Sequence, residues 1–324
     1  MDQLSKVWLV YLLGYEMKTI RIGTRNSQLA LWQAYYVRDA LKAIHDDLQV
    51  ELVEVVSEGD RTLDIPLHQA GGKGLFLKEL ELALLDGSID LAVHSMKDVT
   101  ITLPEGLHIS AYCPREDPSD AFVSNACAGL EDMPVGSVVG TCSLRRQSQI
   151  RWKFPHLQLK NLRGNVNSRL RKLDEGQYDA IILASAGLMR LDMEHRIAQR
   201  IDSSICLPAV GQGIVGIESR MNDDVVNSLI KPMNDRESSI RVTAERATNE
   251  RLGGGCHAPI AVFCEIGDND NLTLRGRVGE LDGSRIIHCE LAGHVDSPAD
   301  LGRRLADDLL AQGAAVILES VPLI

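Results

Sequence analysis

The sequence predicts an α/β protein of three domains, in which two similar, doubly wound α/β domains are followed by a smaller α+β domain. Three observations support this prediction. The chain has 324 residues, more than one ordinary hydrophobic core holds. Its first part twice repeats an alternation of short apolar runs and amphipathic stretches, which is typical of βαβ units. Its last part breaks this rhythm and places strand-like runs between two helices.

The first domain is expected to start at residue 17. Residues 1–16 carry a short apolar run without a signal-peptide pattern, and we expect them to be a disordered N-terminal extension or a misassigned start. The apolar runs that follow are short and not strictly alternating, as in parallel strands that are covered on both faces. The expected strands are residues 19–23, 50–56 and 89–93, and the expected helices are residues 27–43 and 76–85.

The second domain repeats the pattern. Its expected strands are residues 137–140, 157–161 and 179–184, and its expected helices are residues 143–152 and 166–173. Residues 208–218 then form a glycine-punctuated turn that runs into an apolar strand. Because this strand could return to the first sheet, we expect a discontinuous first domain of residues 17–113 and 214–232. The second domain would then span residues 114–213.

The third domain is expected over residues 233–324. Asn234 and Glu237 have the spacing of a capping box, and three glycines end the helix that they start. This helix covers residues 235–252, strand-like runs lie near Ile260, Leu272 and Ile286, and a closing helix covers residues 299–310.

The composition excludes several classes of protein. Hydrophobic residues make up 44% of the chain and charged residues 24%, as in an average globular protein. No run of about 18 apolar residues occurs, which argues against an integral membrane protein. Seven scattered cysteines without a CxxC pair favour reduced thiols and a cytoplasmic location. No His or Cys spacing resembles that of a metal site.

The charge is distributed unevenly. The net charge is -11, yet residues 141–190 contain seven arginines and three lysines against three acidic residues. Arginine pairs bidentately with carboxylates and phosphates, so this window should bind a polyanion. Nucleic acid does not fit an acidic chain with 4% aromatic residues, and there is no P-loop. The alternative for any single arginine is a surface salt bridge.

Two turns within this window are candidate anion sites. Ser143, Arg145 and Arg146 lie where a strand turns into a helix, and Arg163 and Gly164 lie at the next such turn. Free backbone N–H groups and the positive end of the helix dipole favour anions there. Arg169 follows within two helical turns of the second site.

The strand at residues 89–93 ends in His94, Ser95, Met96, Lys97 and Asp98. Ligands of open α/β sheets bind at the carboxyl ends of the strands, so Asp98 is the best placed candidate for a catalytic carboxylate. The alternative is that Asp98 only caps the following turn. His94 is interpreted as a core histidine.

Cys256 follows three glycines and is the candidate reactive thiol. Its place after a helix C-terminus would raise its pKa, so its activation must come from neighbouring cations. The alternative is a buried, inert cysteine, which is the interpretation for Cys206 and Cys264.

Six segments together resemble the porphobilinogen deaminase, or hydroxymethylbilane synthase, family. They are residues 24–33, 71–76, 94–98, 140–146, 162–165 and 207–213. The resemblance extends from about Met17 to the C-terminus. It implies two domains folded like a type II periplasmic binding protein, with the active cleft between them, and a third domain that carries the cofactor cysteine.

The resemblance also implies a reaction. A dipyrromethane cofactor is held by a thioether to Cys256, and four porphobilinogen molecules are condensed onto it head to tail, each with loss of ammonia. Water then releases hydroxymethylbilane. The family further implies a monomer without metal, nucleic-acid or membrane partners.

Residue roles carry over by motif. Asp98 matches the catalytic aspartate. The matched cofactor-binding residues are Cys256, Lys97, Asp98, Thr141, Ser143, Arg145, Arg146, Arg163, Gly164 and Arg169. The matched substrate-binding residues are Arg25, Ser27, Lys73, Ser95, Arg190 and Gln212. Residues 71–74 resemble part of a flexible lid, and residues 114–118 and 207–213 are candidate hinges.

The chain departs from the family at two positions near the site. Gln69 stands where many relatives have lysine, and Cys142 replaces a small serine or threonine. Two other functions fit some of the same features. A dicarboxylate receptor would use the same cleft and arginines, and a hydrolase would use Cys256 as nucleophile and His257 as base.

Overall fold

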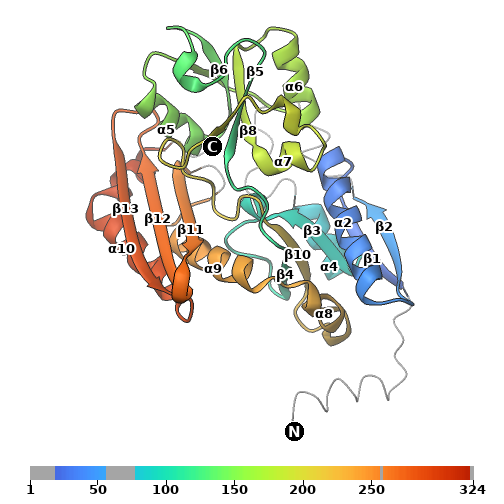
Figure 1. Ribbon diagram of the computed structural model, residues 1–324. Coiled ribbons are helices and arrows are strands. Elements are labelled where there is room, and N and C mark those ends of the chain that lie inside the picture. Colours follow the sequence, from blue (N-terminus) through green and yellow to red (C-terminus); the bar gives the residue numbers. More distant parts are fainter. Residues whose placement is uncertain (1–18, 56–76, 256–257, 322–324) are drawn as a thin grey trace.

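The computed structural model describes residues 19–55, 77–255 and 258–321. The described residues form three sheets, two with five strands and one with three. Figure 1 shows the first at the lower right, the second at the top and the third at the left, each with its own helices. The expected N-terminal extension lies outside the described residues.

The first sheet has the order β2-β1-β3-β10-β4. Its strands are β1 (Thr19–Thr24), β2 (Gln49–Glu54), β3 (Leu91–Ser95), β4 (Leu107–Tyr112) and β10 (Val215–Arg220), and its helices are α2 (Gln28–Ile44), α4 (Lys78–Leu85) and α8 (Asp224–Ile230). The strands β1, β2 and β3 are parallel, as expected, whereas β10 is antiparallel to β3 and β4. The expected return of the chain into the first sheet therefore occurs at β10.

The second sheet has the order β7-β6-β8-β5-β9. Its strands are β5 (Asp120–Ser124), β6 (Val138–Gly140), β7 (Gln158–Lys160), β8 (Ala180–Ala184) and β9 (Gln199–Ile201), and its helices are α5 (Leu144–Lys153), α6 (Val166–Asp174) and α7 (Ser185–Met189). Here β5 is antiparallel to β8 and β9. The fourth strand of each order is β10 in the first sheet and β5 in the second. Each of these strands directly follows a segment in which the chain crosses from one α/β domain to the other.

The two crossing segments, residues 113–119 and 207–214, lie side by side. The backbone N–H of Glu116 donates to Gly213 O (3.1 Å), and the guanidinium of Arg115 donates to Gln212 O (2.9 Å). The side-chain amide of Gln212 donates back to Pro118 O (2.6 Å). The two connections between the α/β domains are therefore joined to each other along their length.

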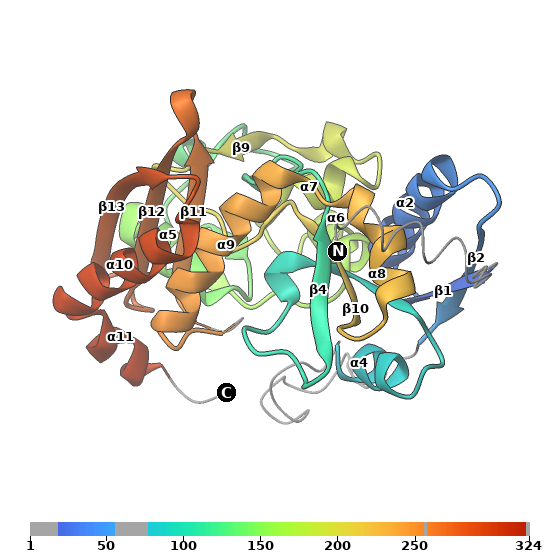
Figure 2. The ribbon, with the colours of Figure 1, turned by 90° about the horizontal axis from the view of Figure 1, so that it is seen from below.

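The third sheet is antiparallel, with the order β11-β12-β13. Its elements are β11 (Ile260–Ile266), β12 (Asn271–Gly279), β13 (Ile286–His294), α9 (Arg236–Arg251), α10 (Pro298–Ala311) and α11 (Ala314–Ser320). Seen from below, α9 lies between this sheet and β4 of the first sheet (Figure 2). This α+β unit confirms the expected third domain, although α11 was not predicted.

The expected capping box at Asn234 is wrong by one residue. Asp235 is the N-cap of α9, and its carboxylate accepts a hydrogen bond from the Ser238 N–H (2.7 Å). The Asn234 side chain instead accepts from the Tyr112 N–H (3.0 Å) and so joins α9 to β4. The Asp235 carboxylate also interacts favourably with the positive end of the helix dipole.

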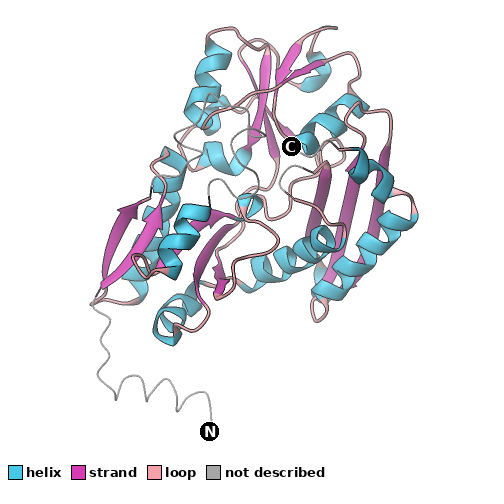
Figure 3. Ribbon diagram, turned by 180° about the vertical axis from the view of Figure 1, so that it is seen from behind, coloured by secondary structure: helices cyan, strands magenta, loops and turns pink. Residues whose placement is uncertain are grey.

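Each sheet has its own buried core, and Figure 3 shows from behind the helices that lie against the sheets. Ile20, Val37 and Leu91 belong to the first core, and Phe122 and Ile150 to one core of the second sheet. The third core is formed by β11, β12, β13, α10 and residues of α9. The fold is thus two α/β domains with the same strand order and a smaller α+β domain, as predicted. Within the described ranges no helix has the length and apolarity needed to cross a membrane.

Candidate active site between the three domains

Asp98 lies at the carboxyl end of β3, where the sequence places it. The strand ends at Ser95, and a short 3-10 helix, Met96–Asp98, follows. Met96 is buried and its N–H donates to Ile214 O (2.9 Å), which fixes the turn to the returning chain. Asp98 itself is exposed, so its carboxylate is accessible to a ligand.

A cavity of about 70 Å³ adjoins this turn. Residues of all three domains line it: Met96, Lys97, Val99 and Ile101 from the first, Ser143 and Arg145 from the second, and Arg246, Asn249, Gly255, Ala258 and Ile260 from the third. Gly255 immediately precedes the predicted cofactor cysteine. The structure therefore brings the turn at Asp98, the start of α5 and the loop after α9 to one place.

Lys97 is the central cation of this region. Burial lowers its pKa to about 8; the charge of Asp98 opposes this shift and that of Arg146 adds to it. Arg169 also lowers the pKa of Lys97, so the three cations lie close enough to repel one another. A bound anion would relieve this repulsion, which makes the cluster suited to carboxylate groups.

Arg145 and Arg146 both bind Asp120, the first residue of β5. Arg145 Nη1 donates to Asp120 Oδ2 (2.7 Å), and Arg146 Nη2 donates to Asp120 Oδ1 (2.7 Å). All three side chains are buried. Burial alone would raise the pKa of Asp120, but the two guanidiniums hold it well below its usual range. The sequence analysis missed Asp120, because nothing local marks a carboxylate 25 positions away as the partner of these arginines.

Ser143 and Asn165 are helix N-caps. The Ser143 hydroxyl accepts from the Arg146 N–H (3.4 Å) at the start of α5, and Asn165 accepts from the Ser168 N–H (2.9 Å) at the start of α6. Gly164 precedes the second cap with φ 118°, and a Cβ there would lie 2.0 Å from the Ser168 hydroxyl. Only glycine fits this turn.

Arg169 extends from α6 toward the same cations. Burial lowers its pKa, while the nearby thiol of Cys142 raises it. Among the described residues, the buried Nε of Arg169 has no hydrogen-bond partner. Buried donors are nearly always hydrogen-bonded, so this Nε is a candidate donor to a bound ligand.

The first domain presents residues of α2 to the second. Ser27 caps α2 by accepting from the Ala30 N–H (3.3 Å). Gln28 accepts from the side-chain amide of Asn167 at the start of α6 (2.7 Å). Arg190 lies 5.4 Å above the ring of Trp32 and donates to Gly213 O (2.7 Å). These contacts hold α2 against α6 and the end of α7.

Buried Gln33 of α2 donates to the Ser95 hydroxyl (2.7 Å), next to the turn that carries Asp98. Gln212 donates to Asp120 Oδ1 (3.0 Å), so this predicted substrate ligand contacts the buried ion cluster. Thr141 is buried, and its backbone carbonyl accepts from Gln147 (3.0 Å).

Several predicted features cannot be compared with the structure. Cys256, His257, Lys73, Gln69 and the expected lid at residues 71–74 lie outside the described residues. The six described cysteines are free thiols. Burial raises the pKa of Cys206 and that of Cys264 to about 12, in agreement with their interpretation as inert. His94 is buried against Glu218 (2.9 Å), as expected for a core histidine.

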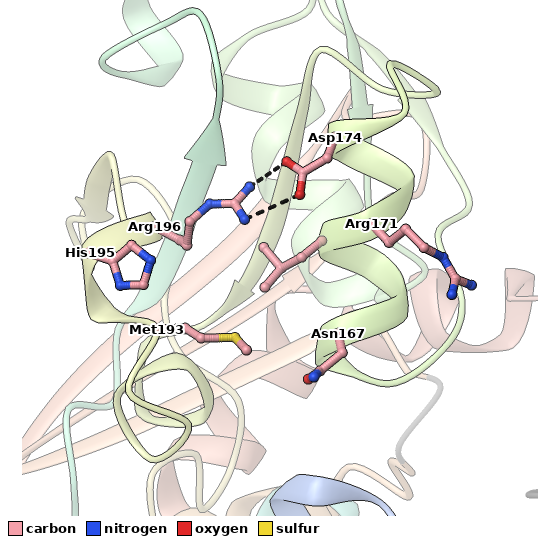
Figure 4. A pocket seen from close by; sticks show the side chains of 7 residues that line it. Asn167, Arg171, Asp174, Met193, His195 and Arg196 are labelled. Atoms are coloured by element: carbon pink, nitrogen blue, oxygen red, sulfur yellow. Dashed lines mark hydrogen bonds and ion pairs between the residues drawn. The ribbon is translucent and has the colours of Figure 1, made fainter.

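A second, open groove of about 300 Å³ lies on the outside of α6 (Figure 4). Its lining includes Asn167, Arg171, Met193 and His195, and two further lining residues, Arg196 and Asp174, pair with each other (2.6 Å). None of the predicted site residues lines this groove. In the part of the chain that the structure describes, no group of three or more His, Cys, Asp or Glu side chains could hold a metal ion.

Comparison with known families identifies the relationship. Residues 20–228 match the family model "Porphobilinogen deaminase, dipyromethane cofactor binding domain", and residues 239–311 match "Porphobilinogen deaminase, C-terminal domain". The chain belongs to the porphobilinogen deaminase family. The resemblance in the sequence is thereby confirmed, and residues 20–228 correspond to the part of the family that binds dipyrromethane.

Solved structures were also compared. A periplasmic domain of Bordetella pertussis BvgS has 14% identity and a TM-score of 0.42, over 71% of this chain and 90% of that one. A putative methionine-binding lipoprotein from Bacillus subtilis has 10% identity and a TM-score of 0.43, over 68% and 92%. Immunogenic lipoprotein A from Vibrio vulnificus has 15% identity and a TM-score of 0.42, over 68% and 96%. Likenesses at this level add nothing to the argument about function.

Proposed function

We propose that this member of the porphobilinogen deaminase family is a hydroxymethylbilane synthase. It would condense four porphobilinogen molecules head to tail onto a covalent dipyrromethane cofactor, with loss of ammonia at each addition, and then release the linear tetrapyrrole by hydrolysis. The observation that carries this proposal is the meeting of Lys97, Ser143 and Gly255 at one cavity beside Asp98. The six described free thiols fit a reducing compartment, and we propose a cytoplasmic monomer.

The residues at the cavity fit the cofactor. Each of its pyrroles carries an acetate and a propionate group. The site offers mutually repelling cations and the buried Nε of Arg169, which has no hydrogen-bond partner in the part of the chain that the structure describes. Bound there, the cofactor supplies the pyrrole α-carbon to which the first substrate unit is joined. The residues proposed to hold it are Cys256, Lys97, Asp98, Thr141, Ser143, Arg145, Arg146, Arg163, Gly164 and Arg169.

Arg145 and Arg146 have a divided role in this proposal. Their guanidiniums neutralise Asp120, and each also donates to a backbone carbonyl, Leu207 O (2.7 Å) or Ile182 O (2.9 Å). We propose that they act through their residual positive charge and by fixing the start of α5, whose N-terminal N–H groups point to anions.

The proposed substrate ligands are Arg25, Ser27, Lys73, Ser95, Arg190 and Gln212. Of these, Ser27 caps α2 and Arg190 lies over Trp32 of the same helix, so both lie at the contact between α2 and the second domain. Gln212 donates to Pro118 O and to Asp120. We therefore propose that it affects substrate binding indirectly, by holding the two crossing segments in place.

Asp98 is proposed as the catalytic group. Loss of ammonia from porphobilinogen leaves a cation whose charge is shared with the pyrrole nitrogen, and a fixed carboxylate beside that nitrogen stabilises it. Opposite unit charges at 4 Å interact by roughly 4 kcal/mol at an effective dielectric constant of 20. One carboxylate would then contribute a rate factor on the order of a thousand.

The substitution Asp98→Asn tests this role. The side chain is exposed, so the variant should fold normally and lose most turnover, measured as ammonia released from porphobilinogen. Asp86→Asn on the same domain is a control, because Asp86 ends α4 at the surface and should leave the rate unchanged. A near-normal rate for Asp98→Asn would remove this residue from the mechanism.

The intact denatured mass tests the function as a whole. Wild-type protein should carry the mass of two condensed pyrrole units, and Cys256→Ser should not. If the wild type shows the bare sequence mass, incubation with porphobilinogen should load it and should release ammonia. A protein that binds porphobilinogen, gains no adduct and returns the substrate unchanged would instead be a receptor.

A further inference from the structure

Arg246 joins the third domain to the turn that carries Asp98. It lies on α9, and its Nη2 donates to Thr100 O (2.7 Å) and Ile101 O (2.9 Å). Its Nη1 also donates to Val99 O at 3.5 Å. These carbonyls belong to the residues that directly follow Asp98. One guanidinium therefore holds the chain immediately after the proposed catalytic carboxylate.

An apolar contact supports the same junction. Met96 and Val99, on either side of Asp98, are buried in a small cluster with Ile214 and with Val242 of α9. Val242 precedes Arg246 by one helical turn and lies on the same face of α9. The turn at Asp98 is thus fixed to α9 both by packing and by the guanidinium.

The same helix leads into the cofactor loop. The Gly254 N–H donates to Asn249 O (3.0 Å), which continues the end of α9 into the glycine segment. A Cβ on Gly254 would lie 2.2 Å from Asn249 Oδ1, so the loop passes closely over the helix end. Gly255 and Arg246 line the same cavity as Lys97. Helix α9 therefore contacts the turn at Asp98 and carries the backbone that precedes Cys256.

Arginine suits this task chemically. The planar guanidinium has five N–H donors in a fixed fork, so it contacts several carbonyls at once, whereas neutral glutamine has one amide donor group. Loss of these hydrogen bonds would weaken the attachment of residues 99–101 to α9. Asp98 itself belongs only to the short 3-10 helix, so its position depends on this attachment.

We propose that Arg246 is a positioning residue, which sets the distance between the Asp98 carboxylate and the helix that anchors the cofactor. This inference rests on the proposed function, in which a single carboxylate must meet the reacting pyrrole of an anchored chain. A displacement of about 1 Å at a reacting group can lower a rate by about 100-fold. Arg246 would act on turnover through Asp98, without touching the substrate.

The test is a double-mutant cycle. Arg246→Gln should lower the rate constant for ammonia release in a single turnover by about 10- to 100-fold. The dipyrromethane adduct in the intact mass and the KM for porphobilinogen should change little. In the Asp98→Asn background, the same substitution should have almost no further effect, because the group that it positions has lost its charge. A merely structural role would lower both backgrounds by the same factor.

Arg251→Gln is the matched control, since Arg251 lies on α9 but pairs with exposed Asp307 (2.7 Å). It should leave all three readouts unchanged. If Arg246→Gln fails to fold or to load cofactor, Arg246→Lys is the second variant, because lysine keeps the positive charge but lacks the planar guanidinium. Its loss of rate should be smaller, and it should again disappear in the Asp98→Asn background.

Equal losses in both Asp98 backgrounds, or no loss at all, would overturn the inference while the proposed function stands. A wild-type protein that releases no ammonia from porphobilinogen would contradict the proposed function itself.

Discussion

The buried carboxylate of Asp120 gives the sharpest prediction about stability. It lies at the start of β5 and neutralises Arg145 and Arg146, and it also accepts from Gln212 (3.0 Å). The substitution Asp120→Asn keeps the shape of the side chain and removes its charge. Two buried guanidiniums at the start of α5 would then lie close together without this counterion. We expect a large loss of stability because these cations cannot move to water without opening the second domain.

The magnitude follows from the burial of the pair. The Asp120 side chain is fully buried, and those of Arg145 and Arg146 are exposed by only 6% and 7%. Removing one partner of a buried ion pair lowers the free energy of unfolding by about 3–5 kcal/mol. Since the folded state holds the pKa of Asp120 well below its usual range, this stabilisation is fully present above the unfolded pKa of about 4. It decreases progressively as the pH falls from there toward the lower pKa of the folded state.

Urea unfolding followed by circular dichroism measures the effect. At pH 7 the midpoint of Asp120→Asn should fall by about 1 M or more, for an m-value of about 1–3 kcal/mol per molar urea. Asp174→Asn is the control in the same domain, because Asp174 pairs with Arg196 at the surface and should lose at most about 1 kcal/mol. Equal midpoints for the two variants, or a difference between Asp120→Asn and wild type that persists unchanged at pH 3, would refute the reasoning.

Two more predictions concern other buried charges. Glu245 accepts from Arg115 (2.6 Å) and from the Gly211 N–H (2.7 Å), so Glu245→Gln should lower the free energy of unfolding by about 3–5 kcal/mol, against about 0.5 kcal/mol or less for the exposed Glu237→Gln on the same helix. Urea unfolding checks this, and equal losses would contradict it. The pKa of Lys97 is about 8, so binding of an anionic pyrrole near pH 9 should take up a proton, because the anion favours the charged amine. Calorimetry in buffers of different ionisation enthalpy measures this uptake, and Lys97→Arg should abolish it.

The long elements were predictable because periodicity and capping agree in them. Helix α2 has a serine N-cap, and its buried residues Ala34, Val37 and Leu41 recur at helical spacing. Strands β4, β5 and β9 and helices α7, α8 and α11 were missed. Helix α7 has five residues including a glycine, too few for a period to show, and β9 has three. The conformation of a short segment depends on the strands and helices that pack against it. Those neighbours are not visible in the local sequence pattern.

The candidate site was predictable in its residue types and less so in their pairing. The motif at the end of β3 located Asp98, since the end of an apolar strand is marked in the sequence itself. The partners Asp120 and Arg246 were missed because each contacts residues that lie far from it in the sequence. Asp120 meets Arg145 from a distant strand, and Arg246 meets residues 99–101 over a separation of more than 140 positions. Only the tertiary fold shows such contacts.

The surplus of positive charge in residues 141–190 therefore has two uses, which a count of charges does not separate. Arg145 and Arg146 neutralise Asp120, and Arg151 donates to Leu281 O at the contact with the third domain. Arg169, in contrast, keeps a buried donor without a partner among the described residues and lowers the pKa of Lys97. The first group joins the protein to itself, whereas the second keeps a donor that a ligand could use. The charge that remains for binding carboxylates is thus smaller than the sequence suggests, and under the proposed function it would be concentrated beside Asp98.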